Sequence, residues 1–390
     1  VTITAFDIKM YEEVNSALAD GIESVDMLLK SRIEAKQRDP SHIIAAGWKE
    51  DESLRNSITI LKDIAKVLSN GCIKLILLMK AKPSNDALAS LLSELSNHAK
   101  LLTAHYFKFL ENSVADCLFD SVTRAVRTLL SHIQDFLRAL QSGSTDSLNY
   151  MVGMVTKIVD AMEKIPLSNK QAYRTLFMQN CILVKETLQE FKAYLDEARE
   201  KRARQAEELP ESVLTGVANI ALSAQGPVVA EDVDGDSEQD SDEENDEDDC
   251  EDELDYTPEE VRVVEASVVL LGKTVSCIKH TLFIATTVCD AIIAPTNAST
   301  ATDATEEGAE KHSQQWVAQL AHLTQLLNKD ALDLGAELYP PFESDLTKIN
   351  ANFDNLRSHC LAYLQLVNAE SLRGMQSAEH TAKIAELTAE

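Results

Sequence analysis

Residues 54–79 read LRNSITILKDIAKVLSNGCIKLILLM, and apolar residues recur in this stretch at heptad spacing. Two alternating positions of each heptad are filled by Leu54, Ile58, Leu61, Ala65, Leu68, Cys72, Leu75 and Met79. Such a pattern predicts a helix of about 39 Å with a continuous apolar seam. The seam can pair with a second copy of the chain as a leucine zipper, giving a homodimer, or pack inside a bundle of its own chain. We favour the bundle, because five more apolar residues widen the face beyond a two-stranded seam. They are Ile60, Ile64, Val67, Ile73 and Leu77.

Helical periodicity continues on both sides of this stretch. Further helices are predicted at 5–38, 84–112, 114–140, 147–163, 168–208, 257–293, 310–337 and 342–370. The pairs Ser168 with Gln171 and Thr257 with Glu260 have the spacing of a capping box at a helix start. Only 12 Gly and 9 Pro occur in 390 residues, and aromatic residues make up 5%. The sequence therefore predicts an all-α protein of antiparallel bundles of long amphipathic helices.

An acidic run, Glu231–Asp255, interrupts the helical pattern. Nineteen of the 64 acidic residues of the chain lie between Glu231 and Glu260, without any Lys or Arg. A run that repels itself and has little apolar surface to bury is typical of a disordered acidic linker. The predicted order is an N-terminal helix and linker (1–47), a helical bundle (48–208), the disordered linker (209–256), C-terminal helices (257–370) and a tail (371–390). We expect the C-terminal helices to form a second bundle or to dock on the first.

Composition narrows the class of partner. The net charge of −28 and the pI near 4.7 argue against nucleic-acid binding and fit a basic protein surface at the acidic run, or solubility alone. Seven scattered cysteines without CxxC spacing indicate a reduced, intracellular protein. No apolar stretch is long enough for a bilayer, and no signal peptide is visible, although the chain starts at Val1 rather than Met.

Motifs of catalysis and cofactor binding are missing from the sequence. We find no P-loop, GxGxxG, HExxH or GxSxG, which predicts a protein that is not an enzyme and needs no cofactor. His98 and His105 share a helical face, but no Cys or carboxylate lies at helical spacing between them, so bundle histidines are favoured over a metal site. A basic cluster is read either as a nuclear import signal or, preferably, as a solvated helix end. It consists of Arg199, Lys201, Arg202 and Arg204.

Two serines of the acidic run are candidate phosphorylation sites. Asp240 follows Ser237 by three positions, and Glu244 follows Ser241 in the same way. This spacing suits an acid-directed kinase such as casein kinase 2, and phosphorylation would add roughly −1.5 to −2 charges per site. The alternative is that both serines only keep the linker soluble.

Three features in fixed order resemble one protein family. Ile165-Pro-Leu-Ser-Asn-Lys-Gln-Ala172 leads into a helix with Val184-Lys-Glu186, the acidic midsection follows, and Leu338-Tyr-Pro-Pro341 opens the last long helix after Asp330 and Leu332-Asp-Leu334. Together they resemble the cyclin-D-binding, also called cyclin-D-interacting or maternal-Id-like, family over roughly residues 48–370. Residues 1–47 and the length of the acidic run differ from the family pattern.

The resemblance implies a non-enzymatic intracellular regulator. Such proteins bind D-type cyclin and adaptor or helix-loop-helix proteins, restrain cyclin-dependent phosphorylation of the retinoblastoma protein, and occur in cytoplasm and nucleus. They lack a DNA-contacting basic segment, and the heptad is the best zipper candidate in this chain. The alternative function is a cytoskeletal adaptor built like vinculin or talin bundles, because long amphipathic helices suit that class equally. An acidic histone-type chaperone is a weaker option.

Overall fold

All regular secondary structure in the described residues is helical, as predicted. The structure, a computed structural model, describes residues 5–38, 51–81, 85–112, 114–142, 147–208, 256–293, 303–342 and 346–368. The helices are α1 (Ala5–Arg38), α2 (Glu52–Lys80), α3 (Asn85–Leu110), α4 (Asp116–Gln141), α5 (Leu148–Glu163), α6 (Asn169–Glu208), α8 (Pro258–Ile293), α9 (Asp303–Ala336) and α10 (Thr347–Asn368). α3 and α4 are separate helices, as predicted. The acidic run lies outside the described residues.

The chain divides into two compact units. Unit 1 contains Val1–Ile182, Ser276–Leu326 and Leu361–Glu390, and unit 2 contains Leu183–Val275 and Leu327–Cys360. Helices α6, α8, α9 and α10 therefore each contribute residues to both units. Helix α1 lies in unit 1 with α2–α5. The predicted domain limits stay a prediction.

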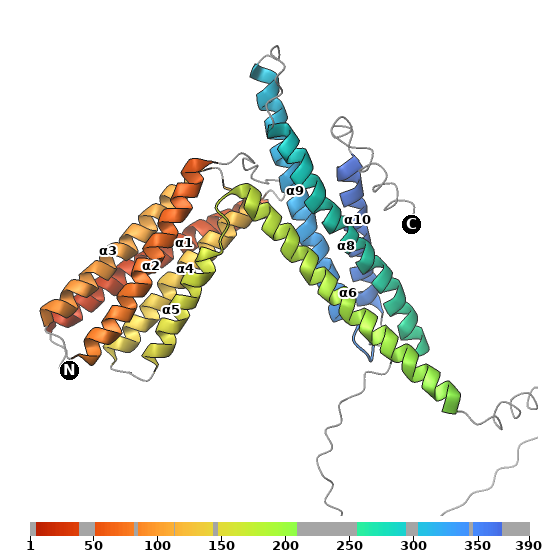
Figure 1. Ribbon diagram of the computed structural model, residues 1–390, viewed down its shortest axis with the longest axis horizontal. Coiled ribbons are helices and arrows are strands. Elements are labelled where there is room, and N and C mark those ends of the chain that lie inside the picture. The colour runs from red at the N-terminus through yellow and green to blue at the C-terminus, as the bar shows by residue number, and fades with distance from the viewer. Residues whose placement is uncertain are drawn as a thin grey trace, which may run out of the picture. The chain divides into compact units, whose positions relative to one another are not determined.

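Helices α1–α5 of unit 1 lie together as one bundle (Figure 1), and their contacts close into a ring around one core. Helix α1 packs against α3 and α4, α2 packs against α3 and α5, and α4 packs against α5. The largest fully buried side chains of this core are aromatic and include Tyr11, Tyr106, Phe109 and Phe136. The Tyr106 hydroxyl lies 2.8 Å from that of Thr123, which satisfies both polar groups inside the core.

Close packing of α2 on α3 explains a glycine inside the heptad helix. Gly71 weakens an isolated helix by about 1 kcal/mol. In the bundle it is buried, and a Cβ atom added to it would lie 2.8 Å from Cδ2 of Leu95. A larger residue at this position would therefore force the Leu95 side chain or one of the two helices to shift.

The C-terminal segments of unit 1 pack through α8, α9 and α10. The His280 ring nitrogen Nδ1 lies 3.1 Å from the Tyr363 hydroxyl, and both side chains are buried. Trp316, which is 4% exposed, donates its indole N–H to the carbonyl of Leu366 at 3.4 Å. A buried aromatic ring with a satisfied polar tip is a stable arrangement between helices.

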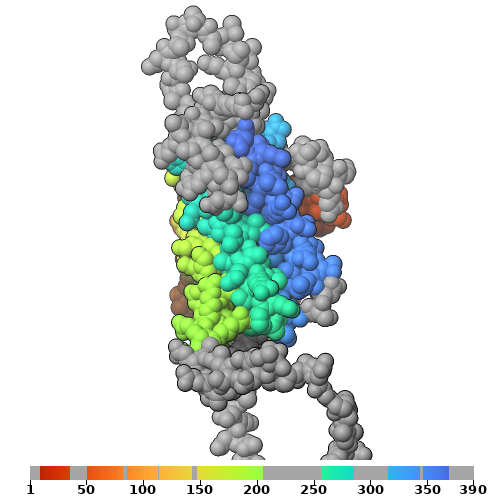
Figure 2. Space-filling view, turned by 90° about the vertical axis from the view of Figure 1, so that its right-hand side faces the viewer, coloured from red at the N-terminus to blue at the C-terminus, as the bar shows by residue number. Residues whose placement is uncertain are grey.

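Unit 2 is made from parts of four helices, of which α6, α8 and α10 are visible side by side in Figure 2. Arg199 of α6 pairs with Glu265 of α8 at 2.7 Å. The Thr274 hydroxyl of α8 lies 3.5 Å from Sγ of Cys360 in α10, and Asp330 of α9 pairs with His359 of α10 at 2.5 Å. Polar contacts thus join α6 to α8, α8 to α10 and α9 to α10 beside the apolar core.

A hydrogen bond joins the last turns of α6 to the residue that follows the undescribed stretch 209–255. Arg202, near the end of α6, donates from Nη2 to the carbonyl of Tyr256 at 3.1 Å. Helix α8 then begins with the predicted capping box. The Thr257 amide donates to Glu260 Oε2 at 2.7 Å, and the Glu260 amide donates to Thr257 Oγ1 at 3.2 Å.

Candidate partner-binding site

The segment Ile165–Ala172 forms the corner between α5 and α6. The Gln171 amide donates to Ser168 Oγ at 3.3 Å, as a capping box requires. The reciprocal bond is shifted by one residue, because Gln171 Oε1 accepts from the amide of Leu167 at 3.1 Å rather than from that of Ser168. The corner therefore has a fixed shape at the start of α6.

Lys62 of α2 fixes the end of α5. Its ammonium group donates to the carbonyls of Glu163 at 2.9 Å and Ile165 at 2.8 Å. The Glu163 carbonyl is one that a helix end leaves without a partner, and Ile165 lies two residues beyond that end. Burial lowers the pKa of Lys62, against the opposing effect of the Glu163 carboxylate, and Lys66 lowers it further. Lys66 itself pairs with Glu163 at 3.0 Å.

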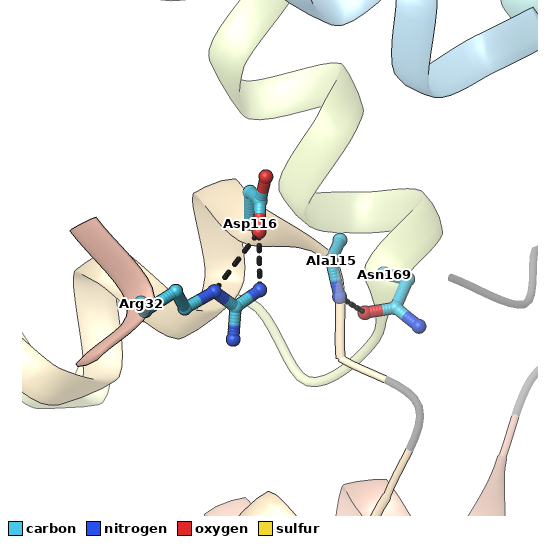
Figure 3. Close-up of polar contacts among 4 residues, drawn as sticks. All are labelled: Arg32, Ala115, Asp116 and Asn169. Atoms are coloured by element: carbon cyan, nitrogen blue, oxygen red, sulfur yellow. Dashed lines mark hydrogen bonds and ion pairs between the residues drawn. The ribbon is translucent and has the colours of Figure 1, made fainter. Parts of the chain in front are cut away.

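The start of α6 also holds the start of α4 (Figure 3). The Asn169 side-chain oxygen accepts from the buried amide of Ala115 at 2.8 Å. In the next residue, Asp116 accepts from Nε of Arg32 at 3.1 Å, and the Arg32 guanidinium lies 3.8 Å from the ring centre of Phe119. The family-like segment thus joins α5 and α6 to α2 and to the residue before α4, and Asp116 of α4 in turn contacts α1.

A groove of about 440 Å³ lies on the outside of this corner. Its lining combines apolar and basic side chains with backbone that the hydrogen bonds above hold in place. The lining residues are Lys62, Glu163, Lys164, Ile165, Pro166, Leu167, Gln171, Arg174, Thr175 and Met178. We call it the α5–α6 groove and regard it as the candidate partner-binding site.

The second family-like segment, Leu338–Pro341, has structural partners inside unit 2. The Tyr256 hydroxyl donates to the carbonyl of Leu338 at 2.9 Å, and the Phe342 amide donates to Glu260 Oε1 at 2.7 Å. The Tyr339 hydroxyl donates to Glu190 Oε1 at 2.7 Å, and this bond together with burial raises the pKa of Tyr339 to about 12. Burial tends to raise the pKa of Glu260, but the amides of Phe342 and Thr257 hold it below its usual value. This segment therefore fixes the end of α9 against α6 and α8.

The heptad seam lies in the core of the bundle. Leu54, Ile58, Leu61, Ala65, Leu68, Cys72 and Leu75 are buried and Met79 is half-buried. These side chains pack within their own chain, which leaves little of the seam for a second copy.

The prediction that five further residues widen the buried face of α2 is wrong for four of them. Of the five added residues only Ile64 is buried, whereas Ile60, Val67, Ile73 and Leu77 are exposed. A side chain at the edge of a helix face is covered only where a neighbouring helix reaches it, and periodicity does not reveal this.

The structure does not bring the remaining predicted residues, namely the two serines, the two histidines and the basic cluster, together into one site. Ser237 and Ser241 lie outside the described residues, and no group of three or more metal-ligating side chains, around His98 and His105 or elsewhere, occurs in the described part of the chain. The basic cluster has partners within unit 2. Arg199 pairs with Glu265, Lys201 with Glu197, Arg204 with Glu200, and Arg202 bonds the Tyr256 carbonyl.

Sequence reasoning missed Lys62 and Asn169. Lys62 carried one signal, since it lies between Ile58 and Ala65 on the apolar stripe of α2, where a lysine must find a buried partner. Asn169 gave none, because its partner amide is far away in the sequence.

None of the helices, over the residues the structure describes, is long and apolar enough to cross a membrane.

Residues 60–197 match the family model described as "Grap2 and cyclin-D-interacting, N-terminal". This match confirms the resemblance predicted from the sequence, because residues 60–197 are similar to the N-terminal domain of cyclin-D-interacting proteins. The matched stretch is about a third of the chain and contains α3–α5, most of α2, the α5–α6 corner and the first part of α6. A comparison with curated proteins gave no match.

Proposed function

We propose that this protein binds D-type cyclin through helical surfaces and thereby restrains cell-cycle progression without catalysing a reaction. The observation that carries the proposal is the match of residues 60–197 to a family named for interaction with cyclin D. Adaptor and helix-loop-helix proteins are further partners that the same proposal includes. The protein acts by covering a surface of its partner with a helix face.

Two buried cysteines are unsuited to act as catalytic nucleophiles. Burial raises the pKa of the Cys72 and Cys117 thiols to about 12. Both thiols are therefore protonated at neutral pH, and a thiol is a far weaker nucleophile than a thiolate. The buried polar groups at the α5–α6 corner are likewise bonded to one another, which suits a structural support for a surface.

The acidic run has a proposed role of its own. Ser237 and Ser241 are phosphorylated in cells, and the run makes electrostatic contact with a basic protein surface in the cytoplasm and the nucleus. Intact-mass measurement of the protein from cells should show up to two phosphoryl groups, which Ser237→Ala and Ser241→Ala remove. Unmodified serines under all growth conditions would refute this part.

The test of the main proposal is binding of the full-length chain to purified D-type cyclin. The chain is immobilised, and cyclin capture is compared with that of other proteins of the family as positive controls and with an A-type cyclin as a specificity control. Saturable capture of D-type cyclin alone is expected. If the folded chain captures no D-type cyclin while the positive controls do, the proposal is wrong.

A cytoskeletal adaptor remains the second candidate. The observation in its favour is that five long helices close into a ring with a single buried core, an architecture that also suits force-bearing bundles. Co-sedimentation of the chain with filamentous actin would support this candidate, and recovery in the supernatant at every actin concentration would exclude it.

A further inference from the structure

The α5–α6 groove is positively charged in a strongly acidic chain. Lys164 and Arg174 are exposed, and neither forms an ion pair with any described residue. Glu163, the acidic residue in the groove lining, is paired with Lys66 at 3.0 Å. The groove therefore presents two unpaired cations, although the chain as a whole carries −28.

Exposed apolar side chains continue this groove along α6. Met178 is 52% exposed and Ile182, one turn further on, is 50% exposed. Arg174 precedes Met178 by one turn, so the three side chains share one face of the helix over about 12 Å. A contiguous stripe of this kind, unlike a single exposed apolar residue, marks an interaction site.

The walls of the groove are fixed before any partner arrives. Lys62 holds the carbonyls of Glu163 and Ile165, and Gln171 holds the amide of Leu167. A partner that binds here pays little entropy for ordering the protein side, which raises affinity. The geometry suits an elongated segment that lies along α6 with one end at the basic corner.

We propose that the α5–α6 groove binds an acidic amphipathic helix of the D-type cyclin partner. Its apolar face covers Met178 and Ile182, and its carboxylates reach Lys164 and Arg174. This inference rests on the proposed function and adds the surface and the chemistry of the bound segment. A nucleic acid is disfavoured, because two cations beside an apolar stripe do not offset the repulsion between a polyanion and a chain of charge −28.

The charge half of the proposal is tested by calorimetric titration of D-type cyclin into the full-length chain. The double variant Lys164→Glu/Arg174→Glu should weaken binding about tenfold or more, equivalent to about 1.4 kcal/mol. It should also flatten the dependence of the affinity on salt, since screened ion pairs no longer contribute. The matched control is Lys108→Glu/Arg124→Glu, which changes the net charge equally at exposed positions of α3 and α4, and its affinity should stay within about twofold of wild type.

The apolar half has its own variant. Met178→Glu should weaken binding at least as strongly as the charge reversal, whereas Leu101→Glu, at a 43% exposed position of α3, should not. A zero-length carbodiimide reagent should join the Lys164 amine to a carboxylate of the cyclin. Circular dichroism and thermal unfolding confirm that each variant is folded.

The outcomes separate this inference from the proposed function. If the wild-type chain binds cyclin and the groove variants bind equally well, the proposed function stands, but the α5–α6 groove is not the binding surface. A loss of binding in the Lys108/Arg124 control as large as that in the groove pair would also overturn the groove, because net charge alone would explain it. Absence of binding by the wild-type chain overturns the function itself.

Discussion

Replacing Lys62 by methionine tests whether a buried ammonium group stabilises the α5–α6 corner. The variant removes two charge-assisted hydrogen bonds, to the carbonyls of Glu163 and Ile165, each worth about 1.5–3 kcal/mol. It also removes the cost of burying the charge of a side chain that is 8% exposed, which offsets part of the loss. We expect a net destabilisation of about 2 kcal/mol. For a unit of this size that lowers the midpoint of thermal unfolding by about 4–8 °C.

The assay is urea and thermal unfolding of the full-length chain, followed by circular dichroism. Hydrogen exchange adds local information, because protection should fall first in the corner that Lys62 holds. The matched control is Lys66→Met, one turn along the same helix. Lys66 loses only an exposed pair with Glu163, so its cost should stay below about 1 kcal/mol.

The opposite result is physically meaningful. Suppose that Lys62→Met is as stable as wild type or more stable, and that hydrogen exchange in the corner is unchanged. The free-energy cost of burying the ammonium group would then equal or exceed the stabilisation by its two hydrogen bonds. The Lys62 contacts would then not be what holds the corner, and the reasoning that links the family-like segment to α2 would be refuted.

Three further predictions concern single polar or titratable groups. Asn169→Ala should destabilise the protein by about 1–3 kcal/mol in urea unfolding, because the buried amide before α4 loses its acceptor. Glu260→Ala should speed hydrogen exchange of the Phe342 amide. The pKa of Glu260 is lowered in the folded protein, so its carboxylate contributes to folding stability above the unfolded pKa. That contribution is lost as the pH falls through the folded pKa. The pKa values of Cys72 and Cys117 are raised to about 12 in the folded protein, so their thiols contribute to folding stability below the unfolded thiol pKa. That contribution should be lost between about pH 9 and 12. A double alanine variant should therefore lose less stability over this pH range.

Each of these predictions has a contrary outcome. A neutral Asn169→Ala would mean that water replaces the side-chain oxygen. Unchanged exchange at Phe342 would show that the Glu260 bond does not hold this corner. An identical alkaline decline in the double cysteine variant would assign that decline to other groups, such as the buried tyrosines.

Local signals in the sequence predicted most of the helices well. The starts of α6 and α8 were found because capping residues act within one turn of the chain. The start of α9 was predicted too late, at 310 instead of Asp303. The stretch before 310 is rich in Ala and Glu, which are good helix formers, and the Thr residues nearby masked that preference.

The candidate site was predicted only as a segment. The eight residues Ile165–Ala172 were singled out by resemblance, but their role in fixing the corner was not visible. Lys62 and Glu163 are separated by 101 positions, and Ala115 and Asn169 by 54. No periodicity connects residues at such separations.

The sequence by itself determined that the chain is helical, where the capped helices α6 and α8 begin, and which stripe of α2 is apolar, because helical period and capping depend on neighbours within about one turn. Only the tertiary structure decided that the Leu54–Leu75 seam lies inside a five-helix ring, that Ile60 and Leu77 stay exposed, and that Lys62 ends in the corner of another helix. Burial depends on which helices become neighbours in space, and that is settled by the packing of the whole bundle.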